Sequence, residues 1–142
     1  MQRNVPRKLA ANLYLGNSVV LIAHEIDSAY WHEWELFGLP GGIQFFLILH
    51  VALLGVVLWG YRSVVLWSRG ARMYSYLLAC AGIFAALIHG GLLAAGTPQF
   101  RSPTSVALLI GTLILSIWQI AVVKRCRNKP SLKVRADNER AG

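Results

Sequence analysis

Residues 24–35 read His-Glu-Ile-Asp-Ser-Ala-Tyr-Trp-His-Glu-Trp-Glu, and the predicted fold is organised around this stretch. It holds four of the six acidic residues of the chain and two of its four histidines. Apolar runs lie on both sides of it. Because hydrocarbon strongly disfavours ionisable groups, such a cluster beside or within a membrane span indicates a functional site.

The rest of the chain is too apolar for a soluble domain. Hydrophobic residues make up 56% of the 142 residues and charged residues only 14%, against roughly 45–50% apolar residues in an ordinary soluble domain. Three segments contain no Lys, Arg, Asp or Glu, namely 36–61, 73–100 and 102–123. Each of them reaches the roughly 20 residues that are needed to cross a bilayer core. A shorter apolar segment, 9–23, leads directly into the polar cluster.

We therefore expect an all-α integral membrane protein, in which residues 1–142 form one four-helix transmembrane bundle. The expected spans are about 9–31, 43–61, 73–95 and 104–123, followed by a basic tail at 124–142. The strongest break is the run 39–42, Leu-Pro-Gly-Gly, because proline restricts the residue before it and glycines permit turn conformations. The first residue of the first span stays open. A span of about 20 residues that begins at Leu9 ends near Ser28, and one that begins at Leu13 reaches His32.

Topology explains the net charge of +8 better than nucleic-acid binding does. In a four-span arrangement thirteen of the fourteen Lys and Arg residues lie on one side, and only Arg101 lies on the other. The positive-inside rule assigns the basic side to the cytoplasm, so both termini are expected there and residues 24–35 face outward. A three-span arrangement would lose this bias. Residues 1–23 could also be a cleaved signal peptide, but no small-x-small cleavage site follows them, and their removal would lose the bias as well.

Contacts with lipid and between helices are also expected. The basic tail 124–142 suits anionic lipid headgroups, and no nucleic acid is expected as a partner. Small residues recur at helical spacing along the third span and should allow close packing against neighbouring helices. They are Ala79, Gly82, Ala86 and Gly90. Three polar residues of the fourth span are expected to bond across helices: Thr112, Ser116 and Gln119.

Three histidines from three spans come to about the same depth on the outer side. His50 lies about 10 Å inside the start of the second span, and His89 lies about 9 Å from the end of the third. His24 lies at a similar depth below Trp31. His89 adjoins the row of small residues, so it is expected to face the interior of the bundle. Facing helices that contribute carboxylates and histidines are how bundle cores build metal sites.

If the first helix continues through residue 35, one of its faces presents two imidazoles and three carboxylates. The five residues that share roughly 160° of arc are His24, Glu25, Asp27, His32 and Glu35. Glu25 and His32 then lie on one stripe of the helix, and Glu33 lies at the back. Candidate ligands of a divalent transition metal are His24, Glu25, Asp27, His32, His50 and His89.

The function of this site stays open between three hypotheses. As an enzyme, it would use a metal-activated water with Glu25 or Asp27 as the base. As a proton relay, it would need no metal. In the alternative, the chain is a non-catalytic accessory protein whose cluster fixes helix packing, lies solvated beside Arg101, or docks a membrane protein partner or a second copy. No nucleophile triad, phosphate loop or dinucleotide fingerprint supports a more specific chemistry.

The run His24-Glu25-x-Asp27-x-x-Tyr30-Trp31-x-Glu33-Trp34, followed by Phe37 and Pro40-Gly41-Gly42, resembles a family of small uncharacterised bacterial membrane proteins with four helices. The resemblance covers mainly residues 20–50. The chain is also loosely similar to the HxxEE membrane family, although it lacks a contiguous His-x-x-Glu-Glu. The resemblance implies a multi-pass protein of the bacterial cytoplasmic membrane, and neither family brings an established activity.

Overall fold

Five helices follow one another in this computed structural model, which describes residues 4–127. They are α1 (Asn4–Tyr30), α2 (Glu33–Leu36), α3 (Gly42–Val65), α4 (Ala71–Ala94) and α5 (Pro103–Arg127). All of them except α2 are long and apolar enough to cross a membrane, which confirms the four expected long helices. All four run further into the basic segments than expected, because Lys and Arg have high helix propensity. The expected tail beyond residue 127 lies outside the described residues.

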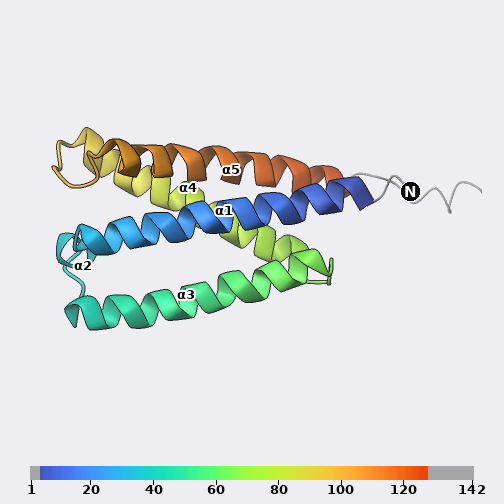
Figure 1. Ribbon diagram of the computed structural model, residues 1–142, viewed down its shortest axis with the longest axis horizontal. Helices are drawn as coiled ribbons and strands as arrows, with labels where there is room; N and C mark the ends of the chain where they lie inside the picture. The colour runs from blue at the N-terminus through green and yellow to red at the C-terminus, as the bar shows by residue number, and fades with distance from the viewer. Residues whose placement is uncertain (1–3, 128–142) are drawn as a thin grey trace, which may run out of the picture.

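The central helix of the bundle is α1. It packs against α3, α4 and α5, whereas α3 and α5 make no contact with each other in the described chain. Figure 1 shows α5 and α3 on opposite sides of α1, with α4 crossing behind. The end of α1, the whole of α2, the start of α3 and the 95–102 connection share one end of the bundle, here called the α2 end.

The basic residues gather at the opposite end of the bundle. Among the described residues, that end holds Arg7, Lys8, Arg62, Arg69, Arg72, Lys124, Arg125 and Arg127. Of the described Lys and Arg residues, only Arg101 lies at the α2 end, where its guanidinium donates to the carbonyls of Gly96 (2.6 Å) and Thr97 (3.1 Å). This distribution agrees with four spans that place both ends of the described chain on one side.

A buried polar network joins three helices at mid-bundle. The Asn17 amide Nδ2 donates to Ser116 Oγ at 3.1 Å and to Gln119 Oε1 at 3.0 Å. The Thr112 hydroxyl donates to Asn17 Oδ1 at 3.2 Å, and Gln119 Nε2 donates to the carbonyl of Ser75 at 2.8 Å. The expectation that Thr112, Ser116 and Gln119 bond across helices is confirmed, with Asn17 as their unexpected partner.

Close approach of α4 to α5 depends on a glycine. A Cβ atom at Gly82 would lie 2.7 Å from Thr112 Oγ1 and closer still to Ser116 Oγ. Ala79, one turn away, is completely buried. A Cβ atom at Gly90 would meet nothing within 4 Å, so close contact along the small-residue row is confirmed only in its first half.

The least buried of the long helices is α3. Its buried residues are Phe46, Gly60 and Val64. Near its C-terminal end, the hydroxyl of Tyr14 donates to the carbonyl of Val57 at 3.0 Å and occupies the place where a Gly60 Cβ would lie. At the α2 end of this helix, Phe46 is its only buried residue. The helix is thus held firmly at one end and loosely at the other.

The chain between α1 and α3 departs from the expectation. The predicted continuation of the first helix through residue 35 is wrong, because α1 ends at Tyr30 and His32 adopts a left-handed backbone with φ 54°. This turn carries Trp34 over to α3, where its ring lies 5.4 Å from that of Phe46. The expected break at residues 39–42 is confirmed, since Gly41 and Gly42 both have positive φ, at 84° and 58°.

Candidate functional site

A cavity of about 720 Å³ lies between α1, α2, α3 and α4 in the half of the bundle nearest α2. Most of its wall is apolar, including Leu21, Leu53, Val57 and Phe84. Five ionisable residues also line it: His24, Glu25, Glu33, His50 and His89. Among the described residues that form the wall there is no Lys or Arg. The cavity therefore combines apolar space with carboxyl and imidazole groups only.

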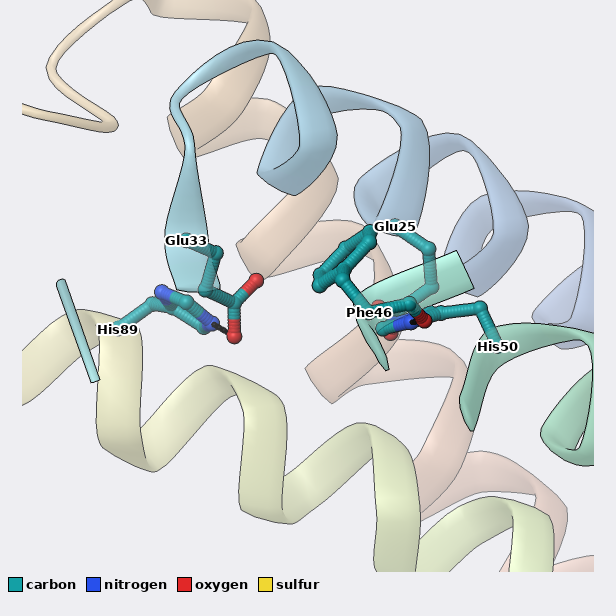
Figure 2. A network of polar contacts seen from close by, with 5 residues as sticks. All are labelled: Glu25, Glu33, Phe46, His50 and His89. Carbon is teal, nitrogen blue, oxygen red and sulfur yellow. Dashed lines mark hydrogen bonds and ion pairs between the residues drawn. The ribbon is translucent and has the colours of Figure 1, made fainter. Parts of the chain in front are cut away.

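Glu25 on α1 and His50 on α3 form a short contact on this wall. Glu25 Oε2 lies 2.6 Å from His50 Nε2 (Figure 2). The other ring nitrogen, Nδ1, contacts the carbonyl of Phe46, one turn earlier in α3, at 2.7 Å. The Phe46 ring stacks on the imidazole with centroids 3.8 Å apart. Two hydrogen bonds and one stacked ring thus fix the orientation of His50.

These contacts determine where the protons of His50 lie. A backbone carbonyl can only accept a hydrogen bond, so Nδ1 carries a proton and donates to Phe46. A separation of 2.6 Å between Nε2 and Oε2 requires a second proton between them. That proton sits either on His50, giving imidazolium and carboxylate, or on Glu25, giving imidazole and carboxylic acid. The pair is neutral in both forms, and loss of the shared proton would leave one negative charge in an apolar wall.

Glu33 on α2 and His89 on α4 form a second pair. Their Oε1 and Nε2 atoms lie 3.5 Å apart, with side chains 16% and 4% exposed. Figure 2 shows the Glu33 carboxylate pointing toward the His89 ring, while Glu25, Phe46 and His50 form a separate group. Both groups line the same cavity. The second pair ties the short α2 helix to the rest of the bundle.

The electrostatic surroundings of Glu33 favour its charged form. Burial is the largest single influence and would raise the pKa of this carboxyl. The neighbouring His89, Ser28 and His24 together outweigh burial and hold the pKa of Glu33 below its ordinary value of 4.5. Glu33 is therefore a carboxylate at neutral pH, and it supplies a negative charge on the α2 side of the cavity.

His24 lies beside this second pair. It is only 1% exposed, and its ring meets that of His89 edge-on with centroids 4.8 Å apart. Phe100, from the 95–102 connection, covers both rings at centroid distances of 4.4 Å from His89 and 6.2 Å from His24. The expected common depth is confirmed, because the rings of His24 and His89 are in contact and His50 contacts Glu25, the neighbour of His24. His89 faces the interior as expected, whereas His50 pairs with Glu25 and not with the other two histidines.

Several buried polar atoms at the α2 end have no hydrogen-bond partner within the described chain. They are His24 Nδ1, Asp27 Oδ2, Ser28 Oγ, Trp31 Nε1, Glu33 Oε2, His89 Nδ1 and Gln99 Oε1. Buried polar groups in proteins are almost always paired, so these atoms need partners that the described side chains do not supply, such as water or a bound molecule. Three of these atoms belong to residues of the cavity wall, namely His24, Glu33 and His89.

Two of the residues predicted for the site do not line the cavity. His32 is exposed, and its ring lies 5.0 Å from that of Trp34. The predicted stack of Glu25 on His32 along one helix face is wrong, because the chain turns at His32 after α1 has ended. Asp27 is half-buried in the last turns of α1, and its role as a base stays a prediction. Arg101 bonds to backbone carbonyls rather than to the acidic cluster.

The geometry gives no support to metal binding. The described residues contain no group of three or more His, Cys, Asp or Glu side chains that could hold a metal ion. Catalytic zinc sites use three protein ligands and structural ones use four. The candidate ligands instead divide into the Glu25–His50 and Glu33–His89 pairs, with His24 beside the second.

Sequence reasoning missed the contributions of Glu33 and Phe46. Glu33 was placed on the back of a continuous helix, whereas α2 turns it toward His89. The sequence signal for a break in this helix is the moderate helix propensity of Trp31, His32 and Trp34. Phe46 carries no polar group, so the sequence gives no reason to place it in a polar site. It lies four residues before His50, however, and residues four apart in a helix lie on one face.

Fold and site together define a class of all-α protein with four long apolar helices, three of which enclose, together with the short α2, a cavity that contains carboxyl groups and histidines. The chain belongs to the family of unknown function DUF6713, which matches residues 10–126. That match includes every residue of the cavity wall. Comparison with curated proteins and with solved structures finds no match. The family assigns no activity, so a function has to come from the chemistry of the site.

Proposed function

We propose that this chain is a multi-pass membrane protein in which the Glu25–His50 pair takes up and releases a proton. One observation carries the proposal: Nε2 and Oε2 lie 2.6 Å apart while Nδ1 is already committed to the Phe46 carbonyl. The pair therefore holds one transferable proton between two atoms. An ionisable pair within an apolar helix bundle is a functional-site hypothesis by default.

Accessibility supports exchange of this proton. The His50 and Glu25 side chains are 20% and 32% exposed, and both line the cavity. The pair can thus meet water or a ligand from the cavity.

The membrane setting of the proposal has separate support. Along α3, apolar side chains such as Ile48 and Val51 are 70% and 71% exposed, as expected for a helix that faces lipid. The concentration of basic residues at one end favours the cytoplasm for that end and for both termini. It also favours contact with anionic headgroups there. The bacterial cytoplasmic membrane is inferred from the resemblance of residues 24–42, and the link to the HxxEE family stays a prediction.

A structural role for the pair is the alternative, and one observation favours it. At the α2 end α3 has little other contact with the bundle, so the Glu25–His50 bridge could serve to hold it against α1. In this case the chain would be an accessory protein, and the pair would keep its proton permanently.

Spectroscopy of the full chain in lipid nanodiscs distinguishes the two roles. Infrared absorption detects a protonated Glu25 through its carboxylic C=O stretch, and ¹⁵N NMR detects the protonation of His50. Together they follow the shared proton whichever atom holds it. If the pair exchanges protons, at least one of the two signals should change when the pH is varied.

Two variants assign the signals. Glu25→Gln should remove the infrared signal of the pair and alter the pH dependence of the His50 NMR signal, and His50→Gln should do the reverse, because the remaining group then titrates without its partner. Glu35→Gln is the matched control, since Glu35 is exposed on α2 and does not line the cavity. Constant infrared and NMR signals across the titration would identify the pair as a fixed bridge and support the accessory role.

A further inference from the structure

We propose that the cavity binds a lipophilic primary ammonium, with its N–H groups directed at Glu33 Oε2 and its apolar body along α3. This inference goes beyond proton exchange at Glu25 and His50, and it does not depend on it. It rests on the charge of the cavity wall, on the unpaired acceptors in that wall and on the distribution of apolar residues.

The charge of the wall selects a cation. Among the described residues that line the cavity, carboxyl groups and imidazoles are the only ionisable groups. The Glu25–His50 pair is neutral in either of its proton arrangements, so Glu33 is the carboxylate of the wall that is left to attract a cation. An anionic headgroup would meet this carboxylate with no Lys or Arg nearby on the described wall to compensate it.

The unpaired atoms of the wall select a ligand with hydrogen-bond donors. Glu33 Oε2 is buried without a hydrogen-bond partner among the described residues, and a carboxylate oxygen can only accept. His89 Nε2 lies 3.5 Å from the other oxygen, Glu33 Oε1, and so leaves Oε2 available. His24 and His89 are 1% and 3% exposed, so both belong to the interior of the site. A primary ammonium has three donors and no acceptor, so it can donate to Glu33 Oε2.

The apolar part of the cavity requires a hydrophobic body. From Phe46 to Val57 the α3 side of the wall extends over about 16 Å. Beyond the level of His50, the α3 side is apolar, with Leu53 and Leu54, and Phe84 of α4 adds to this apolar surface. Aromatic rings beside the polar end, such as Phe37, favour a cation through its attraction to the ring face. A cavity of about 720 Å³ falls within the roughly 300–1,000 Å³ of small-molecule sites.

Equilibrium dialysis with 4-phenylbutylammonium tests the inference. The full chain in zwitterionic nanodiscs should bind this probe saturably, in excess of empty nanodiscs. Three analogues with the same body should bind at least about tenfold more weakly, because they lack the charge or the donors. They are 4-phenylbutanol, 4-phenylbutanoate and the N,N,N-trimethyl derivative. No saturable excess, or equal binding of the alcohol or the trimethyl derivative, would overturn the proposal.

Variants locate the site. Glu33→Gln should weaken binding of the ammonium about tenfold and leave binding of the alcohol unchanged, since one charge-assisted hydrogen bond is lost. Glu35→Gln, on the same short helix but exposed, should change neither. Leu53→Trp fills the apolar end of the cavity and should weaken binding of both the ammonium and the alcohol. It tests the location of the site if the Glu33 variant does not fold. Equal effects of the Glu33 and Glu35 variants would also contradict the proposal. Unchanged ammonium binding by Glu25→Gln would separate this site from the proton-exchange pair.

Discussion

The side-chain amide of Asn17 on α1 donates to Gln119 on α5 at 3.0 Å, and the amide of Gln119 donates onward to the Ser75 carbonyl on α4 at 2.8 Å. All three residues are at most 1% exposed. A continuous chain of amides therefore connects the three helices that form the tightly packed part of the bundle. In an apolar interior each of these groups depends on its neighbour, because no water is available to replace it.

Removal of the Asn17 amide should destabilise the bundle. Asn17→Ala would leave donors and acceptors on Ser116 and Gln119 buried without partners, a loss of about 1–3 kcal/mol. Chemical unfolding in detergent measures the change. Asn12→Ala, an exposed asparagine on the same helix, is the control and should have little effect; similar losses from both variants would contradict the network.

A methyl group at Gly82 should also destabilise the protein. Gly82→Ala forces Thr112 and Ser116 away from α4, and overpacking of this kind lowers the free energy of unfolding by about 1–3 kcal/mol. Gly90→Ala adds the same methyl group into open space and should be neutral or stabilising by up to about 1 kcal/mol through helix propensity. Thermal unfolding of the two variants should therefore shift in opposite directions or differ clearly in size, and equal shifts would refute the close contact.

Glu33 should contribute a stability that depends on pH. Its pKa in the folded chain is held below the ordinary 4.5, so the unfolded chain binds more protons and stability rises with pH. The contribution is fully present above pH 4.5 and is lost as the pH falls through the lower folded value. The difference in unfolding free energy between the native chain and Glu33→Gln should be largest at neutral pH and shrink on acidification below 4.5. A difference that grows on acidification would show that His24 and His89 do not favour the carboxylate.

Glu25 and His50 should be energetically coupled. In a double-mutant cycle, Glu25→Gln and His50→Gln should be non-additive by about 0.5–3 kcal/mol, as for residues in direct contact. A second cycle pairs Glu25→Gln with His32→Gln, which lies outside the cavity, and it should be additive. Additivity in both cycles would mean that the 2.6 Å contact contributes nothing to stability.

Reporter fusions should give a four-span topology. Fusions after residues 8, 68 and 142 should report the cytoplasm, because the basic residues direct those segments inward. Fusions near Gly41 and Gln99 should report the opposite side. A C-terminal fusion on the outer side would remove the four-span arrangement and the common orientation of the two termini with it.

The sequence allowed prediction of the long helices and of some contacts between them. Apolar runs of sufficient length specify helices in a membrane, and polar residues within such runs, such as Thr112 and Gln119, need partners there. The common depth of His24 and His89 was also predictable, because the rise of a helix per residue is fixed. The pairing of Glu25 with His50 was not, since depth does not specify how each helix is rotated about its axis. The fold-back of α2 that places Glu33 against His89 depends on tertiary contacts.

The uneven burial of α3 has a mechanical consequence. Close contacts at Gly60 and Val64 make the C-terminal part of this helix a pivot, and the remainder of the helix is a lever arm. His50 lies ten residues from Gly60, or about 15 Å along that arm. A small outward tilt would therefore displace His50 and Phe46 far more than Val64. The first polar contact to separate would be the one between His50 and Glu25. The tilt of α3 and the location of the shared proton would therefore change together.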